Sequence, residues 1–174
     1  MCAEPDAMVL STVDAGGQPS GRFVLLKSFD ERGFVFYTNL GSRKARDLAT
    51  NPQTSLCFYW APLGKQVRIE GAAEPVTEAE ADAYFASRPR DSRLGAWASK
   101  QSAPMASRSD LEVRLIDIGA RFEGREVPRP PFWSGFRVIP RVIEFWTRDA
   151  ARLHVREHFE RDEKNGWVRT ELYP

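Results

Sequence analysis

Cysteine and histidine are scarce in this 174-residue chain, which has two residues of each type. Cys2 stands at the chain start and Cys57 lies inside an apolar run, with no CxxC or Cys/His spacing typical of a metal site. We therefore expect two free thiols, a reducing compartment and no metal. No stretch reaches the roughly 18 consecutive apolar residues of a membrane span, and the first residues lack a basic segment followed by an apolar one. These absences predict a cytoplasmic protein.

A strong net charge is also absent. The chain has 25 Lys and Arg residues against 24 Asp and Glu residues, so its formal net charge is +1. This balance argues against nucleic acid or an anionic membrane as the main partner. The sequence lacks the GxGxxG, Walker and GxSxG patterns as well. With 42% apolar and 28% charged residues, the chain is expected to fold as a single domain over residues 1–174.

Strand signals fill the first part of the sequence. Runs rich in Val and Leu from Ala7 to Val13 and from Arg22 to Lys27 flank the turn residues 14–18, which predicts a hairpin. Aromatic and β-branched runs predict three more strands, at residues 34–38, 55–60 and 66–71. A short helix with Ser42 as its N-cap is expected between the first two of these three strands.

Helix signals follow in the middle of the chain. A capping-box pattern at Thr77 opens a helix to about residue 87. Asp91 or Ser92 can cap a second helix through residue 97. Apolar residues recur at helical spacing after Ser107, which predicts a third helix.

Strands return near the end of the chain. The proline-rich residues 124–135 predict an extended connector. Strands are expected at residues 136–139, 142–146, 152–161 and 167–172, the last two joined by a hairpin turn at Asn165-Gly166. The order of elements predicts an α+β fold, an antiparallel barrel with helices at its periphery.

The segment Ser42-Arg43-Lys44 places two cations at the start of a helix, where the helix dipole already makes the end positive. A phosphate would supply the missing negative charge, bound by the helix N–H groups, the Ser42 hydroxyl and both cations. Arg22 and Lys27, on a neighbouring apolar strand, could reach the same ligand. The alternative, in which these side chains point into water, stays open.

The segment from Arg152 to Arg156 alternates like a strand, so Arg152, His154 and Arg156 should share one face. His154 could hold or exchange a proton near neutral pH. The alternative is the polar outer face of an edge strand, which the local pattern alone favours.

A third cluster surrounds a helix break and could clamp a second anion, because arginine forks match phosphate geometry. A solvated helix end is the alternative. Other polar or amphipathic side chains beside apolar runs could grip a flat heterocycle, although each of them also fits ordinary packing. The anion cluster consists of Tyr84, Arg88, Arg90 and Ser92, and the heterocycle candidates are Gln66, Gln101, Ser102 and Trp146.

Six separated segments together resemble the pyridoxine/pyridoxamine phosphate oxidase family. They are RFVLLK (22–27), FYTNLGSRK (36–44), QVRIEG (66–71), YFASRPRDSRLGAWASKQS (84–102), FWSGFR (132–137) and EFWTRDAARLHVR (144–156). The resemblance runs from about residue 4 to the end of the chain. It implies a split β-barrel homodimer that binds FMN at the subunit interface and oxidises pyridoxamine or pyridoxine 5'-phosphate with O2 to pyridoxal 5'-phosphate and H2O2.

The resemblance also implies roles for matching positions. Residues expected to contact FMN are Arg22, Phe23, Val24, Leu25, Leu26, Lys27, Tyr37, Thr38, Arg43, Lys44, Gln66, Gln101, Ser102, Trp146 and Arg156. Residues expected to bind the phosphorylated substrate are Lys27, Tyr84, Arg88, Ser92, Arg152 and His154. Arg152 and His154 are the expected catalytic pair, which orients the pyridine ring and its reacting substituent.

The chain departs from the family pattern at three places. The N-terminal extension of the family is expected to be absent, Val155 replaces a commonly polar residue, and Glu171 stands where relatives commonly have Arg. Two alternatives stay open. One is a related flavin enzyme with another substrate, such as a phenazine-type oxidase or a flavin reductase, although the segment SRPRDS argues against it because a substrate without phosphate has no use for that cluster. The other, which these departures make possible, is a non-catalytic protein that binds FMN or pyridoxal phosphate.

Overall fold

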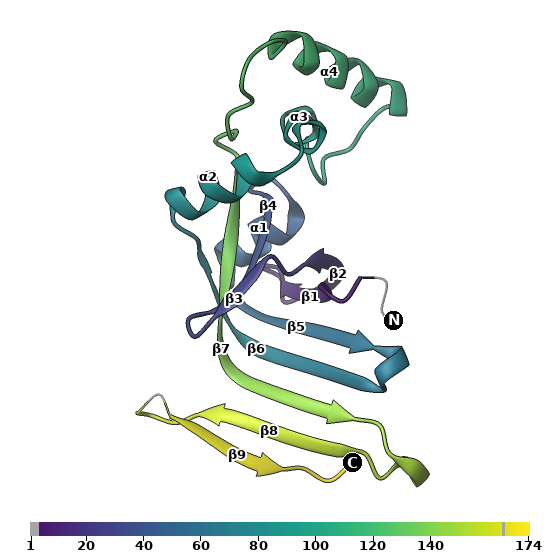
Figure 1. Cartoon of the computed structure of the whole chain (residues 1–174), viewed down its shortest axis with the longest axis vertical. Coiled ribbons are helices and arrows are strands. Elements are labelled where there is room, and N and C mark those ends of the chain that lie inside the picture. Colours follow the sequence, from purple (N-terminus) through teal and green to yellow (C-terminus); the bar gives the residue numbers. More distant parts are fainter. Residues whose placement is uncertain (1–3, 165) are drawn as a thin grey trace. The chain divides into compact units, whose positions relative to one another are not determined.

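The computed structural model of the chain describes residues 4–164 and 166–174, which form an antiparallel sheet and four α-helices (Figure 1). The strands are β1 (Ala7–Val13), β2 (Pro19–Leu25), β3 (Ser28–Asp30), β4 (Gly33–Asn39), β5 (Gln53–Trp60), β6 (Lys65–Pro75), β7 (Trp133–Thr147), β8 (Val155–Arg161) and β9 (Trp167–Glu171). The α-helices are α1 (Arg43–Thr50), α2 (Glu78–Ser87), α3 (Arg90–Ala98) and α4 (Arg108–Arg121), and there are short 3₁₀ turns η1 (Ala61–Leu63) and η2 (Ala150–Arg152).

The strands of the described residues follow the order β2-β1-β5-β6-β7-β4-β3, and β8 pairs with β7 and β9 with β8. The pairings β1–β2, β1–β5, β3–β4, β5–β6, β7–β8 and β8–β9 are antiparallel. The chain divides into two compact units. The first contains the described parts of residues 1–36, 47–74 and 137–174, and the second contains residues 37–46 and 75–136.

Each unit has its own apolar core. In the first unit, β1 alternates so that Met8, Leu10 and Thr12 are fully buried while the residues between them are partly exposed. The second unit is built around Phe85, Phe122, Val127 and Trp133. No helix among the described residues has the length and hydrophobicity needed to cross a membrane.

Local signals in the sequence predicted several elements correctly. The hairpin β1–β2 turns where the Asp14 carboxylate accepts hydrogen bonds from the N–H groups of Gly16 and Gln18. Thr77 and Glu80 form the predicted capping box at the start of α2. Ser107 caps α4 by accepting a hydrogen bond from the Asp110 N–H. Each of these signals acts within a few residues, so the sequence alone contained them.

Other predicted boundaries were wrong. Strand β2 begins at Pro19 and ends at Leu25, so Arg22 lies in the middle of the strand and Lys27 beyond its end. Residues 133–147 form one continuous strand through Pro140, where two strands were expected, because proline is compatible with extended backbone and removes only one N–H donor. Helix α3 has Pro89 as its N-cap and no side-chain cap, in place of Asp91 or Ser92.

Cys57 on β5 is a free thiol, as expected, and burial raises its pKa. Cys2 and Asn165 lie outside the described residues. Strands β8 and β9 form an antiparallel pair on either side of Asn165.

Candidate active site

Hydroxyl and amide oxygens surround the ammonium group of Lys44 in the first turn of α1. The ammonium donates hydrogen bonds to the hydroxyls of Thr38 (3.2 Å) and Ser42 (3.5 Å) and to the side-chain carbonyl of Gln101 (3.3 Å). Lys44 is 9% exposed and Ser42 is fully buried. The fold thus brings together three of the residues predicted to bind the cofactor, Thr38, Lys44 and Gln101, although Gln101 lies more than fifty positions further along the chain.

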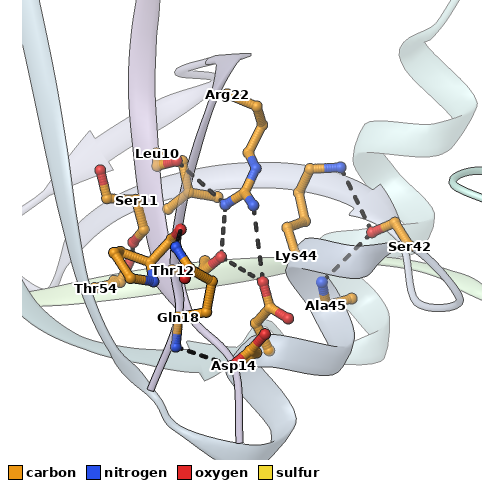
Figure 2. A network of polar contacts seen from close by, with 12 residues as sticks. Leu10, Ser11, Thr12, Asp14, Gln18, Arg22, Ser42, Lys44, Ala45 and Thr54 are labelled. Carbon is orange, nitrogen blue, oxygen red and sulfur yellow. Dashed lines mark hydrogen bonds and ion pairs between the residues drawn. The ribbon is translucent and has the colours of Figure 1, made fainter. Parts of the chain in front are cut away.

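Ser42 precedes the first residue of α1 and caps the helix, as predicted. Its carbonyl accepts a hydrogen bond from the Arg46 N–H (3.1 Å), and its hydroxyl accepts one from the Ala45 N–H (3.4 Å). Figure 2 shows the Lys44 ammonium beside this hydroxyl. Arg43 is exposed at the first helical position. Hydroxyl and ammonium donors at the positive end of a helix form a donor set that suits an anion.

A group of stacked rings lies beside Arg88, which follows the last residue of α2. We call Tyr37, Tyr84, Phe85 and Trp133 the ring cluster. Tyr37 stacks on Tyr84 with 4.0 Å between ring centroids and on Trp133 with 5.4 Å. The Arg88 guanidinium carbon lies 4.8 Å from the Trp133 centroid and 5.5 Å from the Phe85 centroid. Two predicted substrate residues, Tyr84 and Arg88, therefore meet here with a predicted cofactor residue, Tyr37.

The other members of the predicted anion cluster lie differently. Arg90 donates hydrogen bonds to the backbone carbonyls of Phe122 (2.5 Å) and Arg125 (2.8 Å), so it ties the start of α3 to the end of α4. Ser92 is exposed on the first turn of α3. Arg90 thus holds two helices together. Of the predicted anion cluster, Tyr84, Arg88 and Ser92 remain as candidates to bind an anion.

Arg156 on β8 belongs to a charged network in the first unit. Its Nε and Nη2 atoms donate to the two carboxylate oxygens of Glu144 at 3.1 and 2.9 Å, and the Arg68 guanidinium lies 3.5 Å from the same carboxylate. Glu144 is 5% exposed. The hydrogen bond from Arg156 lowers the pKa of Glu144, although burial opposes this shift, and the charges of both arginines add to it. Glu144 thereby fixes the plane of the Arg156 guanidinium.

The turn that carries Arg152 and His154 contradicts the strand expected from residue 152. Residues 150–152 form η2, and β8 begins only at Val155. Ala151 and Arg152 have positive φ angles of 52° and 63°, which are incompatible with extended backbone. The Arg152 side chain is exposed. Arg152 and His154 therefore do not belong to one strand face with Arg156.

His154 is held on two sides within this turn. Its Nδ1 atom accepts a hydrogen bond from the backbone N–H of Asp149 (3.2 Å). Its ring lies 4.6 Å from the ring of Trp146, another predicted cofactor residue. Because Nδ1 acts as an acceptor, the neutral ring carries its proton on Nε2, which is then the donating atom.

Arg22 makes its contacts inside the first unit. Its Nη1 atom donates to the hydroxyl of Thr12 (2.6 Å) and to the carbonyl of Leu10 (3.2 Å), as Figure 2 shows. The Thr12 hydroxyl in turn donates to the Asp47 carboxylate (2.6 Å), and Asp47 forms an ion pair with Arg22 at 3.7 Å. The guanidinium of this predicted cofactor residue thus contacts the protein itself.

Replacing Thr12 by valine is expected to lower the free energy of unfolding by about 1.5 kcal/mol, because the fully buried hydroxyl links Arg22 to Asp47 and valine has the same shape. Urea unfolding would measure the loss. Thr170→Val on the exposed strand β9 is the control and should change stability by less than about 0.5 kcal/mol. Equal effects of the two substitutions would show that the buried network adds no stability.

The remaining predicted residues lie in the first unit, apart from Ser102. The Lys27 ammonium pairs with the Asp6 carboxylate at 3.2 Å. On β2, Phe23 and Leu25 are 76% and 41% exposed, and Val24 alternates with them, while Leu26 follows the strand. Gln66 is half-buried on β6, two positions before Arg68 and therefore on the same face of the strand. In the second unit, Ser102 follows Gln101 with a positive φ of 70°.

Sequence reasoning assigned no role to three residues that hold predicted ones in place. Trp133 lies against Arg88, Glu144 binds Arg156, and the Asp149 N–H binds His154. Only Glu144 left a usable signal, because strand alternation places it on the same face as Trp146.

Two family profiles match the chain. One, described as pyridoxamine 5'-phosphate oxidase, covers residues 1–121, and the other, described as the pyridoxine 5'-phosphate oxidase C-terminal dimerisation region, covers residues 133–174. Two relatives are named pyridoxine/pyridoxamine 5'-phosphate oxidase. The protein from Rubrobacter xylanophilus is 58% identical over 98% of this chain and 78% of its own length. The protein from Myxococcus xanthus is 55% identical over 100% of this chain and 84% of its own.

Solved structures confirm the expected split-barrel fold. PhzG from Burkholderia lata 383, crystallised with tetrahydrophenazine-1-carboxylic acid, has a TM-score of 0.93 and 36% identity, and the match covers 98% of this chain and 83% of PhzG. A pyridoxamine 5'-phosphate oxidase-related, FMN-binding protein from Nostoc punctiforme PCC 73102 has a TM-score of 0.81 and 17% identity, with 99% and 90% of the two chains covered. The second similarity concerns the fold alone.

Proposed function

Because the chain belongs to the pyridoxine/pyridoxamine 5'-phosphate oxidase family, we propose that it uses FMN to oxidise carbon C4' of pyridoxine or pyridoxamine 5'-phosphate. With the alcohol, O2 is consumed and pyridoxal 5'-phosphate and H2O2 are formed. With the amine, one water is consumed as well and ammonia is released. The observation that supports this proposal best is the Arg88 guanidinium, whose buried Nη1 atom has no hydrogen-bond partner among the described residues and suits a substrate phosphate.

The residues around Lys44 fit the phosphate group of FMN. The ammonium, the hydroxyls of Thr38 and Ser42 and the N-terminal end of α1 form a donor set of the right chemistry. Arg43 adds a second cation at the first position of this helix. The chemistry that FMN supplies when bound is the two-electron oxidation of the substrate carbon, followed by the reduction of O2.

The substrate phosphate is assigned to Arg88, with Lys27, Tyr84 and Ser92 as further contacts. Arg88 provides an N–H donor that is already shielded from water, and Tyr84 lies four positions earlier, in the last turn of α2. A planar guanidinium binds phosphate with a defined orientation, which helps to place the distant C4' atom.

Arg152 and His154 are assigned to the pyridine ring of the substrate. The hydrogen bond from the Asp149 N–H leaves His154 with a donating Nε2 atom, which can hold a hydrogen bond to a ring substituent. Arg152 presents an exposed guanidinium from η2. Both residues thus contribute orientation, which is the protein's main task when a cofactor carries the redox chemistry.

We assign the functional assembly to a homodimer. The C-terminal profile describes a dimerisation region, and strands β7 to β9 expose large apolar side chains within that region. These are Phe145, Val155, Trp167 and Val168, between 41% and 53% exposed. Apolar surface of this kind is typical of a protein interface.

The similarity to PhzG favours a second candidate, the oxidation of a tricyclic carboxylic acid without phosphate. Arg88 could bind a carboxylate as well as a phosphate, so the ligand has to be tested directly.

An aerobic assay with the purified holoprotein separates these possibilities. Pyridoxine 5'-phosphate and pyridoxamine 5'-phosphate are added separately, and aldehyde, peroxide and the flavin spectrum are followed. We expect stoichiometric pyridoxal 5'-phosphate and H2O2 from at least one of them. A yellow protein that forms no peroxide with either substrate would refute the proposal, and turnover of tetrahydrophenazine-1-carboxylic acid alone would favour the second candidate.

A further inference from the structure

The guanidinium of Arg88 is a cation removed from water. Its Nη1 atom is buried and has no hydrogen-bond partner among the described residues. Burial lowers the pKa of Arg88, although it remains charged at neutral pH. Such a cation needs a compensating interaction in the absence of a bound anion. The faces of two aromatic rings, Trp133 at 4.8 Å and Phe85 at 5.5 Å, lie close enough to provide it.

The Trp133 ring is fixed by its own neighbours. It is 6% exposed and nearly parallel to Tyr37, with 4° between the ring planes, while Phe85 meets it edge-on at 71° and 5.0 Å. A ring packed on a parallel face and on an edge has little freedom to rotate. Trp133 therefore presents a rigid surface to Arg88.

The backbone of Trp133 is tied to α2, the helix that Arg88 directly follows. Arg129 donates from Nη1 to the Trp133 carbonyl (2.7 Å), and its remaining donors bind Asp82 at 2.6 Å and Glu78, both on α2. Arg129 is thus the shared anchor of Trp133 and α2. This connection ties the Trp133 backbone to the first half of α2.

We propose that Trp133 is a positioning residue for phosphate recognition, holding the Arg88 guanidinium by its ring face so that Nη1 remains available to the substrate phosphate. The inference rests on the proposed function and adds a residue to it. It distinguishes Trp133 from an ordinary core tryptophan, because the loss of mere packing would weaken phosphorylated and unphosphorylated ligands alike.

The test compares two ligands that differ only in phosphate, 4-deoxypyridoxine 5'-phosphate and 4-deoxypyridoxine. Neither has the C4' oxygen or nitrogen that the reaction needs. Calorimetry on the FMN-loaded protein gives both dissociation constants. The dissociation constant of 4-deoxypyridoxine divided by that of its 5'-phosphate measures the phosphate preference. We expect Trp133→Leu to reduce this ratio about tenfold and Trp133→Phe about threefold, since phenylalanine keeps a weaker aromatic face.

Kinetics provides a second readout. In Trp133→Leu, KM for the phosphorylated substrate should rise by about the same factor as the ratio falls, with kcat within about twofold of the parent protein. FMN content should be unchanged. The control is Phe122→Leu, a substitution in the same core, which should leave the ligand ratio as it is.

The variant Arg88→Ala separates a failure of the role of Trp133 from a failure of the role assigned to Arg88 in the proposed function. If Arg88→Ala abolishes the phosphate preference but both Trp133 variants retain it, the role of Trp133 is refuted and the proposed function stands. If Arg88→Ala retains the preference, the assignment of Arg88 fails and the inference fails with it. Should Trp133→Leu not fold, the ratio in Trp133→Phe decides.

Discussion

Arg152→Ala is expected to lower the turnover of the phosphorylated substrate by about 100-fold or more while leaving FMN content at the level of the parent protein. The Arg152 side chain is exposed and has no hydrogen-bond or ion-pair partner among the described residues, so its removal should not disturb the fold. At a φ of 63° the backbone strain of alanine is about the same as that of arginine, so the substitution adds no strain. The expected loss therefore reflects the orientation of the substrate.

Steady-state kinetics and the flavin absorbance of the purified variant would check this expectation. Arg141→Ala is the matched control, because Arg141 is also exposed and its pairing with Glu160 is a surface ion pair. The control should retain turnover within about twofold. Normal turnover in Arg152→Ala would contradict the assignment of Arg152, and a joint loss of turnover and flavin would point to a cofactor role instead.

Glu144→Gln is expected to lower the free energy of unfolding at pH 7 by about 2 kcal/mol, because the buried carboxylate binds Arg156 through both oxygens and also faces Arg68. The amide removes the negative charge and leaves two cations beside a neutral group. Glu157→Gln is the control. Its pairing with Arg169 on β9 is largely exposed and should contribute less than about 0.5 kcal/mol.

The same substitution predicts a specific pH dependence. The pKa of Glu144 in the folded protein is below its ordinary value, mainly through the Arg156 hydrogen bond, so its contribution is fully present above the unfolded-state pKa of about 4.3. The contribution is lost as the pH falls through the lower folded-state pKa. Urea unfolding at several pH values should show a constant difference between parent and variant from pH 7 to about 5.5, and a shrinking one below about 4.3. A difference that does not change with pH would refute the role of the charge.

The parts of the fold that short-range signals specify could be predicted from the sequence. The turn around Asp14, the Thr77 capping box and the Ser107 cap each depend on hydrogen bonds within four residues. The alternating pattern of β1 likewise indicates which of its two faces is buried. Such features follow from local geometry and need no knowledge of the rest of the chain.

The turn at Arg152 could not be predicted in this way. The segment has the alternation of a strand, and neither alanine nor arginine favours the left-handed backbone that both residues adopt. The conformation is imposed by its surroundings, including the Asp149 side chain that caps η2. Strand β7 passes through Pro140 where two strands were expected, because the fixed φ of proline is compatible with extended backbone.

The residues of the candidate site were proposed from residue type and resemblance. The side chains and backbone groups that each of them contacts could not be predicted in this way. The pattern around Ser42 indicated an anion at the helix start, yet it left open whether Lys44 points into water. Its hydrogen bond to Gln101 depends on how α1 and the segment after α3 pack, which local patterns do not contain. Trp133 and Glu144 were missed for the same reason, because each acts through a residue more than ten positions away.

Strand β9 has a consequence for handling the protein. Within the part of the chain that the structure describes, it pairs only with β8, so one side of its backbone offers unpaired N–H and C=O groups. Trp167 and Val168 are exposed on the same strand. An uncovered edge with apolar side chains is a template for aggregation. Mutations that separate the protomers of the proposed homodimer should therefore produce insoluble material as well as inactive protein, and yield on expression will report on assembly.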